Sequence, residues 1–170
     1  MDRPYKYCPY CRSELIRNES SLLVCPKGDF KFYNNPRPVV AALIPYRGGV
    51  VTARRGAAPF IGEWCLPCGN IDQFEDPEEA IKREVREETG LIVTVERLLW
   101  AVMPKVPESP VNQIVLHYLC KVTGGELRAG DDVTAVCTPS PQEMPVLCFS
   151  THQHLVADWY EKIWGIRIAA

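Results

Sequence analysis

The sequence lacks several features that would place the chain in a specialised class of proteins. No apolar run is long enough to span a bilayer, and no internal repeat or low-complexity segment occurs. The residues from Met1 to Pro4 do not have the apolar core of a secretory signal. An excess of one charge is also missing, since 19 Lys and Arg residues against 21 Asp and Glu residues give a net charge of -2. We therefore expect a cytoplasmic protein with neither a membrane nor a nucleic acid as its partner.

What is present is the composition of an ordinary globular chain with many cysteines. The 170 residues are 46% hydrophobic and 24% charged, which suits one domain with a small appendage. Thiols stay reduced in the cytoplasm, so the cysteines indicate metal ligands, catalysis or packing before disulfides. The eight cysteines form three groups: Cys8, Cys11 and Cys25; Cys65 and Cys68; Cys120, Cys137 and Cys148.

The first cysteine group has part of the spacing of a zinc site. Cys8 and Cys11 form a Cys-x-x-Cys turn, and a second such turn would complete a tetrahedral zinc site. The second turn is incomplete, because Cys25 is followed by Gly28 where a fourth cysteine is expected, and Asp29 is the nearest oxygen ligand. Zinc held by three cysteines, with Asp29 or water as the fourth ligand, and a metal-free relic are both open. In either case residues 1–35 are expected to fold as a small ribbon-like β segment.

A turn-rich linker, residues 32–38, separates this segment from a second domain over residues 36–170. The apolar run 39–44 predicts a strand, and residues 50–55 predict the strand that returns after the turn at residues 47–49. Further strands are expected over 91–103, 111–122 and 133–137. A closing helix is expected over 151–165, with Ser150 or Thr151 as its cap.

The best-defined element is an acidic helix predicted over residues 77–89. Asp76 can cap its start, Pro77 suits the first position, and Glu79 would complete a capping box. Thr89 and Gly90 are a plausible stop.

Three carboxylates, those of Glu84, Glu87 and Glu88, fall on one face of this helix at spacing i, i+3 and i+4. A solvated stripe is the ordinary explanation of such a run. Here, however, a helical wheel places the acids on or beside the apolar face of the helix and the basic residues on the opposite side. Because like charges at this spacing destabilise a helix by roughly 0.2–0.5 kcal/mol per pair, we favour a divalent cation, Mg²⁺ or Mn²⁺. The basic residues are Lys82, Arg83 and Arg86.

The segment GNIDQFEDPEEAIKREVREETGL resembles the Nudix box, whose specified positions are all filled. They are Gly69, Glu75, Arg83, Glu84, Val85, Glu87, Glu88, Gly90 and Leu91. The resemblance implies an α+β fold, a Nudix α/β/α sandwich with a mixed sheet, and a hydrolase that cleaves diphosphate bonds.

The same resemblance implies roles for individual residues. Glu84, Glu87 and Glu88, with the carbonyl of Gly69, would bind Mg²⁺, and Glu75 would pair with Arg83. Bound Mg²⁺ neutralises phosphate charge and activates the attacking water. The base that takes the proton of the water is drawn from Glu87 or Glu88, or from Asp131 or Asp132, although a polar hairpin end is the preferred explanation of the aspartates. The flanking segments also resemble the family, and Arg55 and Trp64 are expected to bind substrate.

A ribbon before a Nudix domain resembles NADH pyrophosphatases and plant-type FAD pyrophosphatases. The segment 103–110 lacks the aromatic signature of NADH-specific members, which favours a substrate such as FAD or ADP-ribose, split into a nucleoside monophosphate and a phosphorylated remainder. The alternatives are an NADH pyrophosphatase, a nucleoside triphosphate pyrophosphohydrolase, an isoprenoid diphosphate isomerase and a non-catalytic nucleotide sensor. A homodimer is the default expectation.

The remaining cysteines and histidines are expected to pack. Cys65 and Cys68 form a second Cys-x-x-Cys, which could be redox-active or bind metal, but packing beside the active site is preferred. A metal cluster of Cys148, His152 and His154 is disfavoured, because histidines two residues apart do not share a helical face. Cys120, Cys137 and His117 are expected in the core or on a sheet face.

Overall fold

The computed structural model describes residues 5–20, 22–28, 30–33, 35–104 and 112–166. The chain divides into two units, Met1–Pro36 and Arg37–Ala170. No described helix is both long and apolar enough to cross a membrane.

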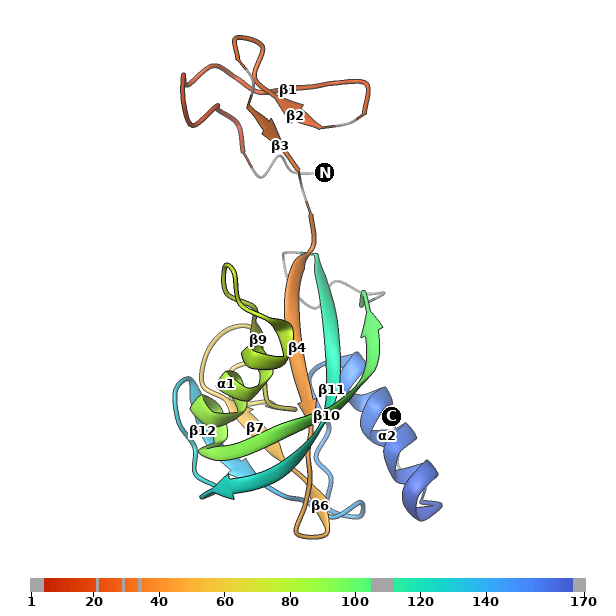
Figure 1. Cartoon of the computed structure of the whole chain (residues 1–170). Coiled ribbons are helices and arrows are strands. Elements are labelled where there is room, and N and C mark those ends of the chain that lie inside the picture. Colours follow the sequence, from red (N-terminus) through yellow and green to blue (C-terminus); the bar gives the residue numbers. More distant parts are fainter. Residues whose placement is uncertain (1–4, 21, 29, 34, 105–111, 167–170) are drawn as a thin grey trace. The chain divides into compact units, whose positions relative to one another are not determined.

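The N-terminal unit contains a small antiparallel sheet of three strands, β1 (Ile16–Arg17), β2 (Leu23–Val24) and β3 (Lys31–Phe32), in that order (Figure 1). Its core is correspondingly small, which agrees with the β segment that the sequence predicts. The buried side chains are Cys8, Leu15, Leu23 and Cys25, with Phe30 and Phe32 packed against them.

The second unit is built around a mixed sheet of four strands in the order β10-β11-β4-β9. The central strands β4 (Arg37–Leu43) and β11 (Gln113–Gly125) run parallel. Both outer strands, β10 (Leu91–Val102) and β9 (Cys68–Asn70), are antiparallel to their neighbours. This register places the loop after β9 beside the start of β4.

A second sheet, in the order β12-β7-β8, corrects one expectation. Residues 50–55 do not form a single returning strand. They divide between β6 (Gly49–Val50), which pairs with β5 (Pro45–Tyr46), and β7 (Thr52–Arg55), which lies between β12 (Val133–Cys137) and β8 (Trp64–Cys65). The hairpin register ends at Val51, whose N–H donates to Ile44 O at 3.0 Å, and the chain then crosses to the other sheet.

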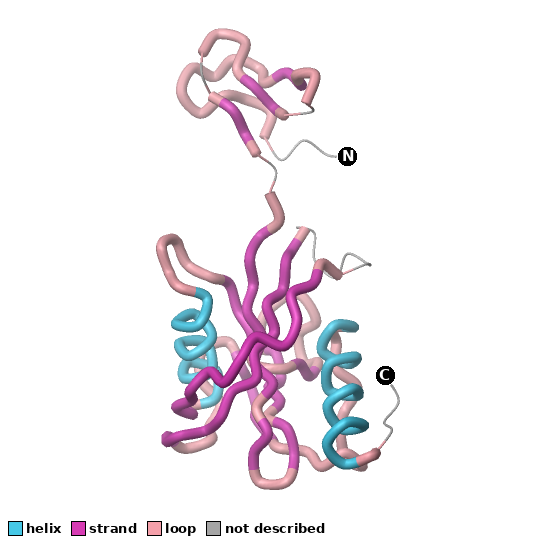
Figure 2. The backbone as a smooth tube through the Cα atoms, turned by 45° about the vertical axis from the view of Figure 1, so that its right-hand side comes forward, coloured by secondary structure: helices cyan, strands magenta, loops and turns pink. Residues whose placement is uncertain are grey.

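Two helices cover opposite sides of these sheets (Figure 2). α1 (Pro77–Thr89) buries Ala80, Ile81 and Val85 in a core with β4, β10 and β11. α2 (Ser150–Trp164) buries Val156 and Tyr160 in a second core. This arrangement is the α+β sandwich with a mixed sheet that the Nudix resemblance implies.

The helix ends show which capping predictions hold. The bounds 77–89 are confirmed, with the Asp76 carboxylate accepting from the N–H of Glu78 at 2.9 Å and Gly90 left-handed at φ 69°. Glu79, which was expected to complete a capping box, forms an ion pair with Lys82, at 2.7 Å between Oε1 and Nζ. The predicted cap of α2 is wrong, because helical backbone already begins at Ser150 and Phe149 occupies the cap position.

Candidate active site

The loop before α1 and the helix itself are joined through one arginine. The Arg83 guanidinium donates to both carboxylate oxygens of Glu75, at 2.7 and 2.8 Å. It also donates to Glu84 at 2.8 Å, to Glu87 at 3.1 Å and to the carbonyl of Asn70 at 3.1 Å. The helical wheel was therefore wrong about Arg83, whose long side chain folds back onto the acidic face.

Glu75 is fixed by this contact and by its own loop. Its carboxylate accepts a further hydrogen bond from the N–H of Asp72 at 2.9 Å. The Arg83 hydrogen bonds, followed by that of Asp72, lower the pKa of Glu75 to about 2. The pair thus has the geometry of a structural clamp between the loop and the helix.

Glu88 is the buried acid of the helix, and Glu84 is partly buried. Glu88 is 3% exposed and accepts from the N–H of Cys68 at 3.0 Å. Burial raises the pKa of Glu88 well above its ordinary value, and it also raises the pKa of Glu84. Gly69 lies against Glu84 so closely that a Cβ there would overlap the carboxylate. A side chain at position 69 would therefore displace the Glu84 carboxylate.

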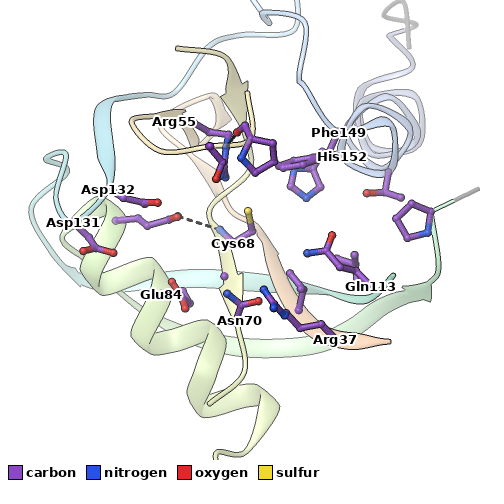
Figure 3. Close-up of a pocket in the computed structure, with 18 residues that line it drawn as sticks. Arg37, Arg55, Cys68, Asn70, Glu84, Gln113, Asp131, Asp132, Phe149 and His152 are labelled. Carbon is purple, nitrogen blue, oxygen red and sulfur yellow. Dashed lines mark hydrogen bonds between the residues drawn. The ribbon is translucent and has the colours of Figure 1, made fainter. Parts of the chain in front are cut away.

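Both acids line a pocket of about 330 Å³, and Figure 3 shows Glu84 on the same side of it as Asp131 and Asp132. The acidic end combines helix and loop residues: Glu84, Glu88, Asp131 and Asp132. Asp131 and Asp132 lie in the turn before β12 and both line the pocket, so the turn explanation and the role of general base both stay predictions.

Arg37, Asn70 and Gln113 line another part of the pocket, away from Asp131 and Asp132 (Figure 3). An aromatic wall adjoins them, in which Phe149 and His152 meet edge to face at 5.0 Å. The pocket is therefore acidic at one end, with cationic, amide and aromatic groups beyond it.

The two residues predicted to bind substrate, and Glu87 of the helix, differ in their position relative to the pocket. Arg55 lines the pocket, but its Nε donates to Pro59 O at 2.7 Å and its guanidinium lies 5.5 Å from the Phe149 ring centre. Trp64 is not among the residues that line the pocket and packs against the core beneath α2, so its role in substrate binding stays a prediction. Glu87 also lies outside the lining residues, with its carboxylate turned to Arg83.

The lining residues that were not predicted include Arg37, Gln113, Phe149 and His152. His152 was considered only in a disfavoured metal cluster, yet it is buried and its Nδ1 accepts from the N–H of Leu66 at 3.1 Å. No local pattern identifies Arg37 or Gln113, since only the parallel pairing of β4 and β11 brings them together.

The cysteines near the N-terminus form a separate group. Cys8, Cys11 and Cys25 have sulfur atoms within 4.8 Å of one another, and Cys11 lies 3.4 Å from Cys25. Gly28 has open space where a Cβ would project, and Asp29, the suggested fourth ligand, lies outside the described residues.

The other cysteines are also free thiols. Cys65 is buried and its Sγ donates to Ala53 O at 3.6 Å, while Cys68 lines the pocket. Cys120 and His117 are buried as expected, whereas Cys137 is only partly buried. These positions agree with packing.

The acidic end has the donor set that a hard divalent cation prefers. Four carboxylates line the same pocket, and the burial of Glu88 and partial burial of Glu84 make their charged forms costly. Added positive charge would offset that cost, so the residues present fit Mg²⁺ or Mn²⁺.

Comparisons with known proteins agree with this geometry. A sequence profile of the NUDIX domain matches residues 35–160. An "ADP-ribose pyrophosphatase" of Methanocaldococcus jannaschii is 33% identical over 130 residues, 76% of this chain and 76% of that protein. A "MutT-like protein" of Streptomyces ambofaciens is 36% identical over 106 residues, 62% of this chain and 64% of that protein. The crystal structure of a NUDIX hydrolase from Nitrosomonas europaea covers 98% of this chain and 97% of its own, with a TM-score of 0.80 and 24% identity. The chain therefore belongs to the Nudix hydrolase family.

Proposed function

We propose that this hydrolase splits the diphosphate bond of a nucleoside diphosphate linked to another moiety, in the FAD or ADP-ribose class. The products would be a nucleoside monophosphate and a phosphorylated remainder. The observation that carries the proposal is the pocket, in which clustered carboxylates at one end leave room beyond them for an organic group. Nudix enzymes generally use Mg²⁺ or Mn²⁺ and act on nucleotide substrates, and one relative bears the name ADP-ribose pyrophosphatase.

In this proposal the acidic residues have different roles. Glu84, Glu87, Glu88 and the carbonyl of Gly69 hold Mg²⁺, which would neutralise phosphate charge and acidify the attacking water. Glu75 and Arg83 keep the loop and helix in register. The proton of the water passes to a carboxylate, for which Glu88, Asp131 and Asp132 face the pocket.

A Mg²⁺-dependent hydrolysis screen tests this proposal. The substrates are FAD, ADP-ribose, NADH, diadenosine polyphosphates and nucleoside triphosphates. Glu84→Gln and Glu88→Gln are expected to lose at least 100-fold in kcat/KM, whereas the matched control Glu79→Gln, on the exposed face of the same helix, retains activity. Activity that survives both pocket substitutions would remove the metal roles. A protein that binds Mg²⁺ yet hydrolyses none of these substrates would instead be the nucleotide sensor.

We also propose that Cys8, Cys11 and Cys25 bind zinc in a ribbon. The support is the clustering of their sulfur atoms and the small core of the unit, for which a metal would supply folding energy. Metal analysis of the purified protein tests this, and zinc no higher than in a Cys8→Ser variant would refute the site. A homodimer and a cytoplasmic location remain expectations from sequence.

A further inference from the structure

The floor of the pocket is formed by two neighbouring parallel strands. β4 and β11 pair with Arg37 opposite Gln113 and Val39 opposite Val115. Alternate residues of a strand point to the same face, so these two pairs share one face of the sheet, and all four residues line the pocket. An apolar pair is therefore followed by a polar pair along the floor.

The register also gives the length of this floor. Gly69, which adjoins the acidic end, pairs with Val40 of β4. Arg37 lies three residues farther along the same strand, and a rise of about 3.3 Å per residue places it about 10 Å from that level. This length is about that of a nucleoside monophosphate measured from its phosphate to the far edge of the base.

The polar pair at the far end offers a complementary set of hydrogen-bonding groups. A guanidinium supplies donors and can also stack on a ring, while the amide of Gln113 supplies a donor and an acceptor. Among the described residues, no carboxylate forms an ion pair with Arg37. The guanidinium is therefore available to a ligand that lies over the two valines.

We propose that Val39 and Val115 support a purine base whose polar edge is bound by Gln113 and Arg37, on the surface that extends from the acidic end. The inference rests on the proposed function and names the part of the substrate that determines specificity. A purine suits this surface better than an additional phosphate, because its faces are apolar and its edge carries adjacent donors and acceptors. A pyrimidine has a shorter ring system and would leave the far pair out of reach.

Binding of AMP, UMP and ribose 5-phosphate, measured by calorimetry with Mg²⁺ present, tests the inference without any turnover. The wild-type protein is expected to bind AMP at least 10-fold more tightly than UMP or ribose 5-phosphate. Arg37→Ala and Gln113→Ala should each weaken AMP binding by about 5- to 20-fold. Both should leave ribose 5-phosphate binding unchanged. Arg97→Ala, at an exposed arginine of β10 outside the pocket, is the matched control and should bind AMP normally.

The outcomes separate this inference from the proposed function. Equal affinity for AMP and ribose 5-phosphate, or for AMP and UMP, would overturn the purine site even in an active hydrolase. Equal losses for AMP and ribose 5-phosphate in Arg37→Ala would also overturn it, since they would indicate a phosphate contact. Conversely, the expected binding pattern in a protein that hydrolyses no diphosphate would uphold the purine site and refute the proposed function.

Discussion

Replacing Glu75 by Gln should destabilise the folded protein far more than a similar change on the exposed face of α1. The wild-type carboxylate is 17% exposed and accepts two hydrogen bonds from Arg83 and one from a backbone N–H. Gln retains one acceptor and turns an N–H toward the guanidinium. Hydrogen bonds to charged groups contribute about 1.5–3 kcal/mol each, and partial exposure reduces their sum, so we expect a loss of about 2 kcal/mol. For a unit of this size that corresponds to roughly 6–10 °C in Tm.

Scanning calorimetry on the wild type, Glu75→Gln and Glu79→Gln provides the measurement. Glu79 pairs only at the surface, so its substitution should cost about 0–1 kcal/mol. Since the folded-state pKa of Glu75 is lowered to about 2, its contribution is present above the unfolded pKa near 4.3 and is lost as the pH falls toward 2. The difference between wild type and Glu75→Gln should therefore shrink below about pH 4. Equal melting temperatures for the two variants at pH 7 would refute the reasoning.

Three further predictions follow from single positions. Gly28→Cys should fit without strain and raise zinc affinity at least 10-fold in a chelator competition; unchanged affinity would place the fourth ligand elsewhere. Burial lowers the pKa of His117 to about 3, so the unfolded chain binds more protons below pH 6.5 and stability falls by about 2 kcal/mol from pH 7 to pH 5. Urea unfolding should show this dependence in the control His154→Gln but not in His117→Phe, and equal slopes in both would contradict it. Gly69→Ala should reduce hydrolysis at least 10-fold by displacing a pocket carboxylate, whereas Gly124→Ala, where a Cβ meets ordinary contacts, should not; two equally active variants would show that the close approach is dispensable.

The parts of the fold that the sequence predicted are those governed by local chemistry. α1 was bounded correctly because Asp76 and Gly90 act on the backbone of their own helix. The helix face predicted for Arg83 was wrong, because a helical wheel describes where a side chain leaves the helix and not where the guanidinium of a long side chain ends. Arg37 and Gln113 were not found at all, because pairing between strands far apart in the sequence leaves no local pattern. The packing of Trp64 against the core was not predicted for a related reason, since it depends on α2, which is distant in the sequence.

The contacts of Arg83 also bear on how a cation would occupy the pocket. The guanidinium already neutralises part of the charge of Glu84 and Glu87. If these carboxylates hold Mg²⁺ as proposed, the ion would compete with a resident positive group, and the affinity of the apoprotein for the ion would be lowered. Phosphate oxygens of a substrate would then supply the ligands that Arg83 withholds, which would couple the two binding events. The proposed metal roles therefore imply an exchangeable ion whose residence depends on substrate.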